Sequence, residues 1–189
     1  MGRGVQLNDS RLFTPGCSNL QPVTKEMETP WFTIRKRGDF YSYEAKSAQV
    51  TIVPIVDSDH LIMVHCKRPL MDDAPLELPA GGFLEKETPQ QAARRELAEE
   101  TGVKIQDLKR FHLDFPFAVM SGRSPHLDHA VTVHINQSEW DQRSQHDAEI
   151  DQVCLISFKD AIEKIRCGEI YSIVPMALIQ REYLKHLEC

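Results

Sequence analysis

Apolar residues in the first half of the chain follow the short, dense pattern of buried strands. The run from Gln49 to Val56 is β-branched and apolar on both faces, as is typical of a central strand. Pro54 interrupts this run, and because proline cannot donate to a sheet we expect a bulge or an edge position there. Ser58-Asp59 predicts a turn, after which His60 to Arg68 predicts a second strand.

The second half of the chain combines strand patterns with two helices. Strand segments are predicted at 111–113, 115–120, 129–135 and 153–157. The polar stretch from Gln137 to Glu149 is expected to be a flexible loop that can close over a substrate. Helices are predicted from Ser157 to Cys167 and from Pro175 to Leu187, the second with an apolar stripe. The pattern therefore predicts a mixed α/β domain.

The N-terminal segment is less regular. Residues 1 to about 30 combine Gly, Pro, Ser and Asn with few periodic apolar residues, so we expect an extended arm. A strand is predicted to begin at Trp31, followed by a turn at 36–39 and extended structure from Phe40 to Tyr43. These elements predict a small strand-rich extension in front of the main domain.

The stretch Gly81–Val103 carries the strongest helix signal. Thr88 is suited to the N-cap and Pro89 to the first helical position, and Gln91 completes a capping box with Thr88. The residues that follow are mostly strong helix formers. Gly102 stands where a left-handed residue would end the helix.

Three acids on this helix are not explained by folding. Glu96 and Glu100 are four positions apart and share a face, and Glu99 lies beside them. Like charges at this spacing repel each other, and the helix dipole opposes them near the C-terminus. Arg95 can answer Glu99 but cannot neutralise all three. Such clustered carboxylates suit a hard divalent cation such as Mg²⁺, and the alternative is a solvated acidic helix face.

Composition and charge exclude several classes of protein. The 189 residues are 41% apolar and 26% charged, which is ordinary for a globular domain with a full core. The formal charge of −6 argues against a general nucleic-acid or membrane-surface binder. No stretch has the pattern of a signal peptide or a membrane span, and the five scattered cysteines favour a reducing compartment. We therefore expect a cytoplasmic protein that binds neither nucleic acid nor membrane.

The stretch Gly81–Val103 reads GGFLEKETPQQAARRELAEETGV and fits G-x5-E-x7-R-E-U-x-E-E-x-G-U, where U is aliphatic. This pattern resembles the Nudix box at every specified position. The resemblance implies a Nudix hydrolase, a metal-dependent enzyme that cleaves a nucleoside diphosphate linked to another moiety. It also implies an α/β/α sandwich around a mixed sheet, with a Nudix domain at residues 46–189 behind the extension at 1–45.

The resemblance assigns roles within the box. Glu96, Glu99 and Glu100 are implied as metal ligands, and Glu99 and Glu100 also as catalytic acids. Arg95 is implied to pair with an acid and orient it, with Glu87 as its partner. The implied metal is Mg²⁺, with Mn²⁺ as a substitute.

A second resemblance lies just before the box. The run Leu76-Glu77-Leu78-Pro79-Ala80-Gly81 is similar to the ADP-ribose pyrophosphatase branch of the family. It implies the Ala80 carbonyl as a metal ligand and Arg68 as a phosphate contact, the alternative for Arg68 being a surface charge at a strand end. Glu77 and Gly82 are implied on the substrate side. Relatives in this branch use the N-terminal sheet to build a dimer, so we expect a homodimer.

The loop from Ser121 to Leu127 departs from that branch. Relatives often carry a Ser-Pro-Gly-Gly-type loop here, whereas Pro125 is the one proline of this loop and the Gly-Gly pair is missing. Arg123 either contacts phosphate or has no role. The departure weakens ADP-ribose as the substrate and leaves the family resemblance intact.

The branch also implies a carboxylate that takes the proton of the attacking water. Glu149 is the first candidate because it directly precedes Ile150 and the predicted strand, and Asp147 is the second; a solvated acidic loop is the alternative. The implied reaction is Mg²⁺-dependent hydrolysis of a pyrophosphate bond, with ADP-ribose giving AMP and ribose 5-phosphate. The alternatives are another nucleotide-sugar, a dinucleotide, or a nucleotide-sensing module without turnover.

Overall fold

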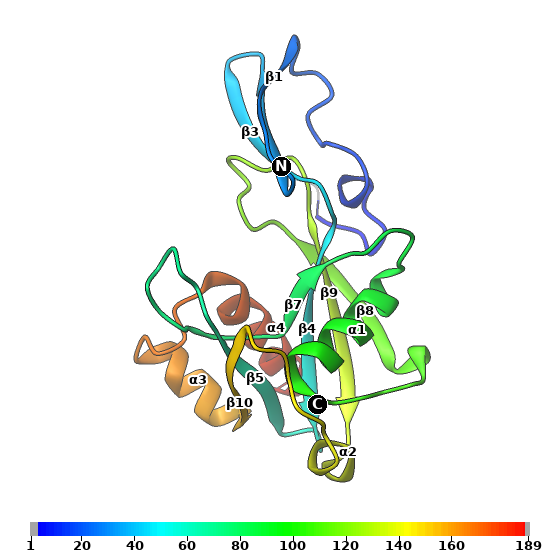
Figure 1. Cartoon of the computed structure of the whole chain (residues 1–189), viewed down its shortest axis with the longest axis vertical. Coiled ribbons are helices and arrows are strands. Elements are labelled where there is room, and N and C mark those ends of the chain that lie inside the picture. Colours follow the sequence, from blue (N-terminus) through cyan, green and yellow to red (C-terminus); the bar gives the residue numbers. More distant parts are fainter. Residues whose placement is uncertain (1–3, 188–189) are drawn as a thin grey trace.

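The computed structural model describes residues 4–187 and shows an elongated molecule with two sheets (Figure 1). The smaller sheet is N-terminal and antiparallel, in the order β1-β2-β3. Its part of the chain contains η1 (Ser10–Leu12), β1 (Val23–Glu28), β2 (Phe32–Arg37) and β3 (Phe40–Ala45). The expected arm thus includes a strand, β1, which is exposed along most of its length and so carries no apolar alternation. Met1 to Arg3 of that arm lie outside the described residues.

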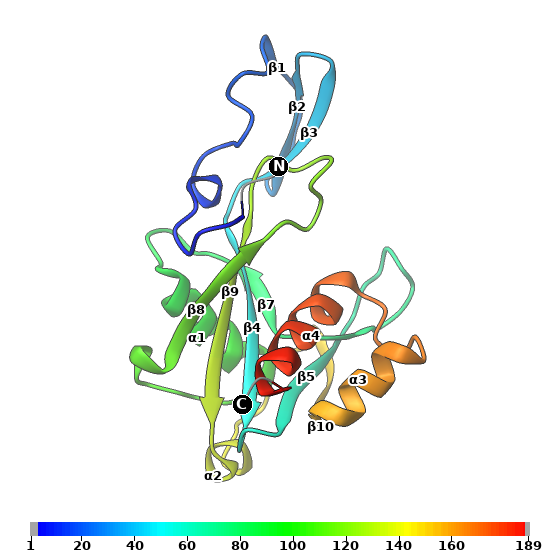
Figure 2. The same cartoon turned by 180° about the vertical axis from the view of Figure 1, so that it is seen from behind.

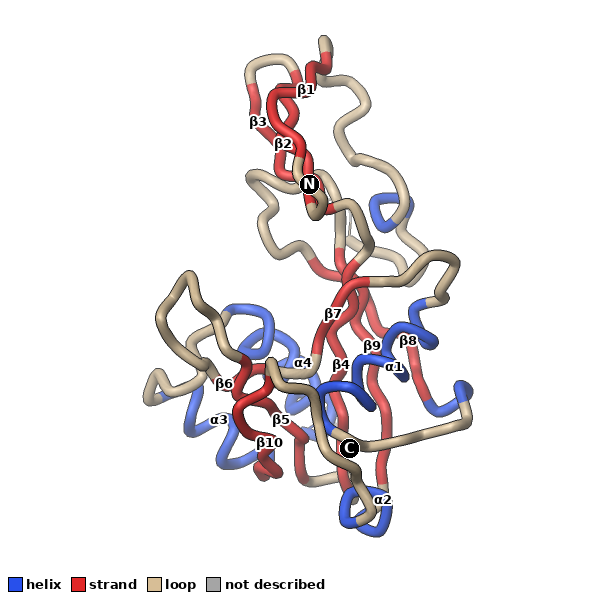
Figure 3. Tube along the Cα trace, viewed as in Figure 1, coloured by secondary structure: helices blue, strands red, loops and turns tan. Residues whose placement is uncertain are grey.

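The larger sheet is mixed and forms the centre of the molecule (Figure 3). In spatial order its main strands are β10 (Ile150–Ser157), β5 (His60–Cys66), β4 (Gln49–Val56), β9 (Asp128–Ile135) and β8 (Phe111–Phe117). β4 and β9 are parallel, and the other neighbours on this path are antiparallel. Two short strands, β6 (Leu76–Glu77) and β7 (Ala80–Gly82), pair with β5 and β4 respectively.

β4 and β5 separate after a short contact. They pair only over Ile55–Val56, and β7 takes the place of β5 beside the first residues of β4. On this edge the Ile52 amide donates to the Pro79 carbonyl at 2.8 Å. Because backbone groups alternate between the two edges of a strand, Pro54 faces the same opening, where no strand requires an amide. Pro54 is buried and its register with β9 is unbroken, so the expected bulge is wrong, whereas the expected edge position holds locally on the side where β4 and β5 separate.

Helices cover both faces of the larger sheet, which confirms the α/β/α sandwich (Figure 2). One face packs against α1 (Pro89–Thr101) and α2 (Gln137–Asp141), and the other against α3 (Phe158–Arg166) and α4 (Ile173–Leu187). Ala92, Ala93 and Leu97 bury α1 against the first face. The small alanines let the box helix lie close to the strands, as its sequence predicts.

Two connections differ from the predicted pattern. The segments expected at 111–113 and 115–120 form one strand, β8, which ends at Phe117, before the predicted end; its register with β9 shifts between Asp114 and Phe117. The polar stretch that was expected to be a loop begins with α2, because Asn136 accepts from the Glu139 amide and Trp140 is buried. Residues 142–149 have no helix or strand before β10.

Backbone hydrogen bonds tie the N-terminal part to the loop between β8 and β9. The amide–carbonyl pairs are Gly16–Pro125 at 3.0 Å, Leu127–Arg11 at 3.1 Å and Tyr43–Arg123 at 2.9 Å. The loop therefore extends toward the small sheet and away from the box helix (Figure 1).

Thiols and helix lengths complete the description of residues 4–187. Cys17, Cys66, Cys154 and Cys167 are free, and Cys66 is buried. Within the same part of the chain, no helix has both the length and the apolar character needed to cross a membrane.

Candidate active site

The box helix α1 begins and ends as its sequence predicts. Thr88 Oγ1 accepts from the Gln91 amide at 3.3 Å, and Gln91 Oε1 accepts from the Thr88 amide at 2.8 Å. At the C-terminus Gly102 has φ of 76°, and its amide donates to the Ala98 carbonyl. These caps fix the box residues at helical spacing beside β7.

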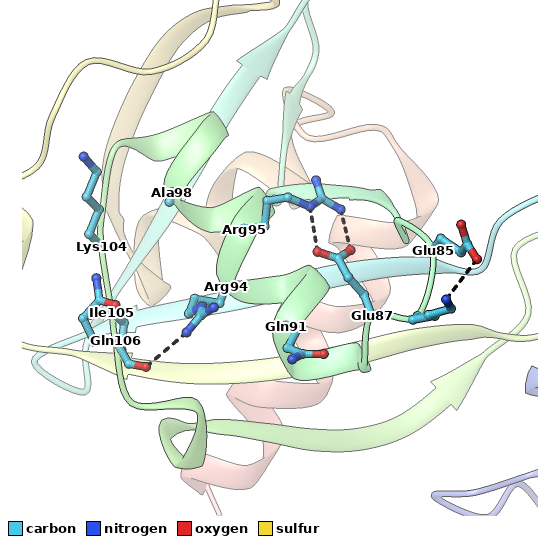
Figure 4. A pocket seen from close by; sticks show the side chains of 10 residues that line it. Glu85, Glu87, Gln91, Arg94, Arg95, Ala98, Lys104, Ile105 and Gln106 are labelled. Carbon is cyan, nitrogen blue, oxygen red and sulfur yellow. Dashed lines mark hydrogen bonds and ion pairs between the residues drawn. The ribbon is translucent and has the colours of Figure 1, made fainter.

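Arg95 is the centre of an ion network on this helix. Its Nε and Nη2 donate to Glu87 Oε1 and Oε2 at 3.0 and 2.9 Å, the bidentate pair drawn in Figure 4. Its Nη1 donates to Glu96 Oε1 at 2.7 Å and to Glu99 Oε2 at 2.9 Å. Nη2 also donates to the Gly82 carbonyl at 2.7 Å, so Gly82, expected on the substrate side, supports this network. The hydrogen bond from Arg95 lowers the pKa of Glu87.

A groove of about 600 Å³ runs along the outer side of α1 (Figure 4). It is lined by Arg94, Lys104 and Gln106 together with the Glu87–Arg95 pair. Glu96, Glu99 and Glu100 do not line it. The clustered acids therefore belong to a different side of the helix, the side that faces β7.

Glu96 is buried against the backbone of β7. A Cβ placed on Gly81 would lie 2.1 Å from Glu96 Cδ, so glycine is required for the carboxylate to occupy this position. Burial raises the pKa of Glu96, and the hydrogen bond from Arg95 offsets this only in part. The negative charge of Glu96 is consequently under-compensated.

Glu100 reaches the same strand from the next turn. Its Oε2 accepts from the Ala80 amide at 3.1 Å. Burial above all, with repulsion from Glu96 and Glu77, raises the pKa of Glu100 to about 8, although the Ala80 amide and Arg68 act in the opposite direction. Two neighbouring box acids thus lie in a place where a cation would stabilise their charged form.

The donor set fits a hard divalent cation, which binds carboxylate and carbonyl oxygens. Glu96 and Glu100 supply buried carboxylates, and the Glu99 side chain is 43% exposed at the rim. Within residues 4–187, however, no group of three or more His, Cys, Asp or Glu side chains is arranged to hold an ion. The reason is that Arg95 holds Glu96 and Glu99 while Glu100 turns to Ala80. Binding of a cation therefore requires the acids to turn away from these partners.

A second network lies at the end of β5. Arg68 Nη2 and Nε donate to Glu77 Oε2 at 2.5 and 3.2 Å, and Ser172 Oγ donates to Glu77 Oε1 at 3.0 Å. All three residues line a cavity of about 390 Å³ that also includes Ala80. The cavity therefore connects the residues predicted to contact substrate with the strand that Glu100 contacts.

Four of the predicted residues have charges that meet near Cys66. Burial above all raises the pKa of this thiol. The charge of Arg68 lowers this pKa, and the negative charges of Glu100, Glu77 and Glu149 raise it further. The fold thus brings a box acid, the Arg68–Glu77 pair and the first candidate base to the same end of β5.

The acidic loop before β10 packs against the C-terminal end of α1. The Ser144 amide donates to the Gly102 carbonyl at 2.9 Å, and the Asp147 amide donates to the Glu99 carbonyl at 2.9 Å. A Cβ on Gly102 would lie 2.0 Å from the Ser144 carbonyl oxygen, so this contact needs glycine as much as the left-handed turn does. Asp147 and Glu149 are both exposed; Asp147 is held beside the box helix, and the Glu149 carbonyl accepts from the Lys67 amide at the end of β5 at 3.2 Å.

Arg123 is placed away from the box acids. It lines a cavity of about 370 Å³ together with Arg11 and Arg37, and this cavity shares no lining residue with the cavity at Ala80. The cause is the hydrogen bond from the Tyr43 amide, which holds the Arg123 carbonyl at the small sheet. The fold therefore does not bring Arg123 to the other predicted substrate contacts.

Asp128 and Ser172 line the cavity at Ala80, and the sequence alone does not identify either of them as a site residue. The available signal for Asp128 was a charged residue ahead of the apolar run HAVTVHI. Ser172 precedes α4, and nothing local connects it to Glu77, which is 95 positions away.

Known proteins share sequence and fold with this chain. A family model described as the NUDIX domain matches residues 46–174. The ADP-ribose pyrophosphatase of Bacillus subtilis (strain 168) is 26% identical over 136 residues, which is 72% of each chain. The ADP-sugar pyrophosphatase of Mus musculus is 36% identical over 119 residues, 60% of this chain and 49% of that protein. A crystal structure of an ADP compounds hydrolase matches with a TM-score of 0.65 and 18% identity, over 88% of this chain and 93% of the other.

Proposed function

This chain belongs to the Nudix hydrolase family, and we propose that it is a Mg²⁺-dependent enzyme that hydrolyses ADP-ribose to AMP and ribose 5-phosphate. The observation that carries the proposal is the under-compensated pair Glu96 and Glu100 beside β7, next to the cavity that contains Arg68. Arg95 supports it, because its hydrogen bonds place the acids along one side of α1.

Nudix enzymes generally use a divalent metal. We assign Glu96, Glu99, Glu100 and the Ala80 carbonyl as the residues that would hold Mg²⁺, with Mn²⁺ as a substitute. When bound, the ion supplies neutralisation of phosphate charge and a lowered pKa for bound water. Arg95 and Glu87 position the ligand acids and do not themselves need to contact substrate.

Arg68 is the residue that we assign to the diphosphate. Its side chain is 46% exposed and lines the cavity at Ala80, and a guanidinium binds phosphate in a bidentate manner. Glu77 orients Arg68, and Ser172 in turn orients Glu77. This arrangement supports a diphosphate lying between Arg68 and the box acids.

Glu149 is our first candidate for the group that takes the proton of the attacking water, and Asp147 is the second. The water oxygen bonds to one phosphorus, the bridging oxygen leaves with the other phosphate, and the water proton passes to the carboxylate. The hydrogen bond between the Asp147 amide and the Glu99 carbonyl supports this assignment, because it keeps the loop beside the box helix.

One observation favours a second substrate class, other ADP-linked sugars. The loop from Ser121 to Leu127 lacks the Gly-Gly pair of the ADP-ribose branch, and Arg123 lies with the N-terminal part of the chain. The mouse relative is described as an ADP-sugar pyrophosphatase. A dinucleotide substrate, or nucleotide sensing without turnover, is the remaining alternative.

We further propose a cytoplasmic homodimer in which residues 1–45 form the contact in front of the Nudix domain at 46–189. Trp31 is 74% exposed on the small sheet, and Phe40 and Tyr41 are also exposed. A second copy of the chain would remove this apolar surface from water. Light scattering of the wild type and of Trp31→Ala measures the oligomeric state directly.

The function is tested by a metal-supplemented screen of nucleoside diphosphate compounds with the wild type and Glu100→Gln. We expect Mg²⁺-dependent release of a nucleoside monophosphate, and a loss of at least about 100-fold in kcat/KM for the variant, since an essential ligand is removed. The matched control is Glu85→Gln, which changes an exposed glutamate outside the site and keeps full activity.

The outcomes separate the alternatives. Equal kcat/KM for the wild type and Glu100→Gln overturns the role of Glu100. Activity on other sugar nucleotides without activity on ADP-ribose changes the substrate and keeps the reaction. Calorimetry that detects no Mg²⁺ binding removes both the catalytic and the sensing assignments.

A further inference from the structure

Asp128 lies at the junction of two cavities beside the box. It opens β9 and lines both the cavity of about 390 Å³ at Ala80 and a hollow of about 790 Å³ that reaches Trp31 on the small sheet. Gln49 and Val119 are the other residues common to both. A substrate that extends from Ala80 toward the small sheet therefore passes Asp128.

Among the described residues, the Asp128 carboxylate has no partner. It is half-buried, and within residues 4–187 it forms no hydrogen bond or ion pair. Burial alone raises the pKa of Asp128 to about 6, with no contribution from a neighbouring donor or charge. Burying a carboxylate without a partner costs free energy, and a ligand that donates hydrogen bonds would recover it.

The charged neighbours of Asp128 are already paired. In the cavity at Ala80, Arg68 is bound to Glu77. In the hollow, Lys46 pairs with Glu28 at 2.9 Å. Asp128 is therefore the carboxylate of these two cavities that keeps its acceptor oxygens open to a ligand.

We propose that Asp128 is a specificity-determining residue that accepts hydrogen bonds from ribose hydroxyl groups of the substrate. The inference rests on the proposed hydrolase function and deepens it by assigning the group that distinguishes the sugar. A carboxylate repels a diphosphate and needs donors, and the paired hydroxyls of a ribose supply two of them. Gln49 and Thr51 add polar groups to the lining of the cavity at Ala80.

The proposal is tested with ADP-ribose and two analogues, one without the hydroxyls of the terminal ribose and one without those of the adenosine ribose. A hydrogen bond to a charged acceptor contributes about 1.5–3 kcal/mol, so the wild type should lose about 10- to 100-fold in kcat/KM on one analogue. Asp128→Ala should already be slow on ADP-ribose and should lose less than about threefold on that same analogue. The analogue that shows this effect identifies the ribose that Asp128 contacts.

Two further variants guard against a trivial loss of structure. Asp128→Asn keeps the shape and one acceptor oxygen, so it should show an intermediate selectivity between the two extremes. Asp59→Asn makes the same change on an exposed residue of the turn between β4 and β5 and should match the wild type. Thermal melting of each variant shows that the fold is retained. Unchanged selectivity of Asp128→Ala and Asp128→Asn on both analogues overturns the proposal.

A binding measurement keeps this test separate from the test of the reaction. Titration calorimetry with AMP and with ribose 5-phosphate needs no turnover, and Asp128→Ala should weaken one of them about tenfold or more. The wild type could show no hydrolysis while Asp128→Ala still binds one product more weakly. In that case the proposed reaction is wrong, and Asp128 still binds the sugar. If the wild type hydrolyses ADP-ribose and neither product binds more weakly to Asp128→Ala, Asp128 alone is wrong.

Discussion

The two walls of the proposed site are built in opposite ways. The box wall consists of β7, Glu87, and the acids and Arg95 of α1, and its longest side-chain contact, Glu100 to Ala80, spans 20 positions. The cavity wall consists of Arg68, Glu77, Asp128 and Ser172, which come from four separate segments; its Ser172–Glu77 contact spans 95 positions.

The walls also differ in how they manage charge. In the box wall one guanidinium answers three acids, and it lowers the pKa of Glu87. In the cavity wall Arg68 forms an ion pair with Glu77, and burial raises the pKa of Asp128 to about 6. Arg95 thus pairs with three of the box acids, although Glu96 and Glu100 stay under-compensated, whereas Asp128 in the cavity wall has no charged partner among the described residues.

This difference assigns different tasks to the walls. Residues held at fixed spacing on one helix cannot change without losing the arrangement of the clustered acids, so the box wall suits the step common to the whole family. Residues from four segments can change one at a time, so the cavity wall suits the choice of substrate. The comparison predicts that box-wall variants lose turnover and cavity-wall variants lose selectivity or affinity.

The largest expected effect is that of Arg95→Ala. The change removes the partners of Glu87, Glu96 and Glu99 at once and leaves Glu96 buried without a cation. We expect a loss of about 100-fold or more in kcat and of about 2–3 kcal/mol in the free energy of unfolding, measured by steady-state kinetics and urea denaturation. Arg95→Lys keeps the charge and loses the bidentate geometry, so its kcat and its free energy of unfolding should lie between those of the wild type and Arg95→Ala.

Arg94→Ala is the matched control for this prediction. Arg94 directly precedes Arg95 on the helix, and among the described residues its guanidinium donates a hydrogen bond just to the Gln106 carbonyl, at 3.4 Å. A comparable loss of kcat in Arg94→Ala and Arg95→Ala would mean that general helix damage, not the ion network, is responsible.

The sequence was sufficient to predict the box wall because its determinants are local. The capping pair Thr88 and Gln91, the terminal Gly102 and the Glu spacing all act within one helix, and the structure shows the predicted caps. The family and the α/β/α sandwich are likewise confirmed. The roles given to Glu96, Glu99 and Glu100 remain predictions.

Of the cavity wall, the family resemblance implied Arg68 and Glu77, whereas Asp128 and Ser172 could not be predicted, because their places depend on how distant segments meet. β7 fills the space left where β5 diverges from β4, and no local pattern encodes this separation. The place of Arg123 also depends on a distant contact, because the small sheet holds it away from the box. Asp128 lies between two cavities that form only when distant segments of the chain come together. Propensity and periodicity describe single elements and carry no information on such contacts.

A smaller effect is expected for Arg68→Lys in the cavity wall. Lysine keeps the positive charge but cannot bind a phosphate through two parallel hydrogen bonds. We expect KM for the nucleotide substrate to rise about tenfold while kcat changes less than about threefold, in contrast to Arg95→Ala. Arg166→Lys, an exposed substitution on α3, should leave both constants unchanged. A drop in kcat with constant KM would show that Arg68 contributes to turnover like the box wall. It would contradict the proposed division of tasks between the two walls.

The smallest effect, and the sharpest contrast between the walls, concerns stability against pH in protein kept free of metal and substrate. The raised pKa of Asp128, about 6 when folded, means that the folded state binds its proton more tightly than the unfolded state does. Its carboxylate therefore reduces stability progressively as pH rises from about 4 to about 6, and Asp128→Asn should gain about 1 kcal/mol at pH 7 and almost nothing at pH 4.

Glu87 should show the opposite sign. Its pKa is lowered by Arg95, so its contribution is present above the usual glutamate pKa and is lost as pH falls through the folded value. Glu87→Gln should therefore be less stable than the wild type at pH 7, and the difference should shrink on acidification. Urea unfolding of both variants from pH 8 down to about pH 2 measures the two slopes together, because the Glu87 contribution changes only below the usual glutamate pKa. A free carboxylate and a paired one must change stability with pH in opposite directions. Parallel slopes would therefore contradict the assignment of Asp128 as free and Glu87 as paired.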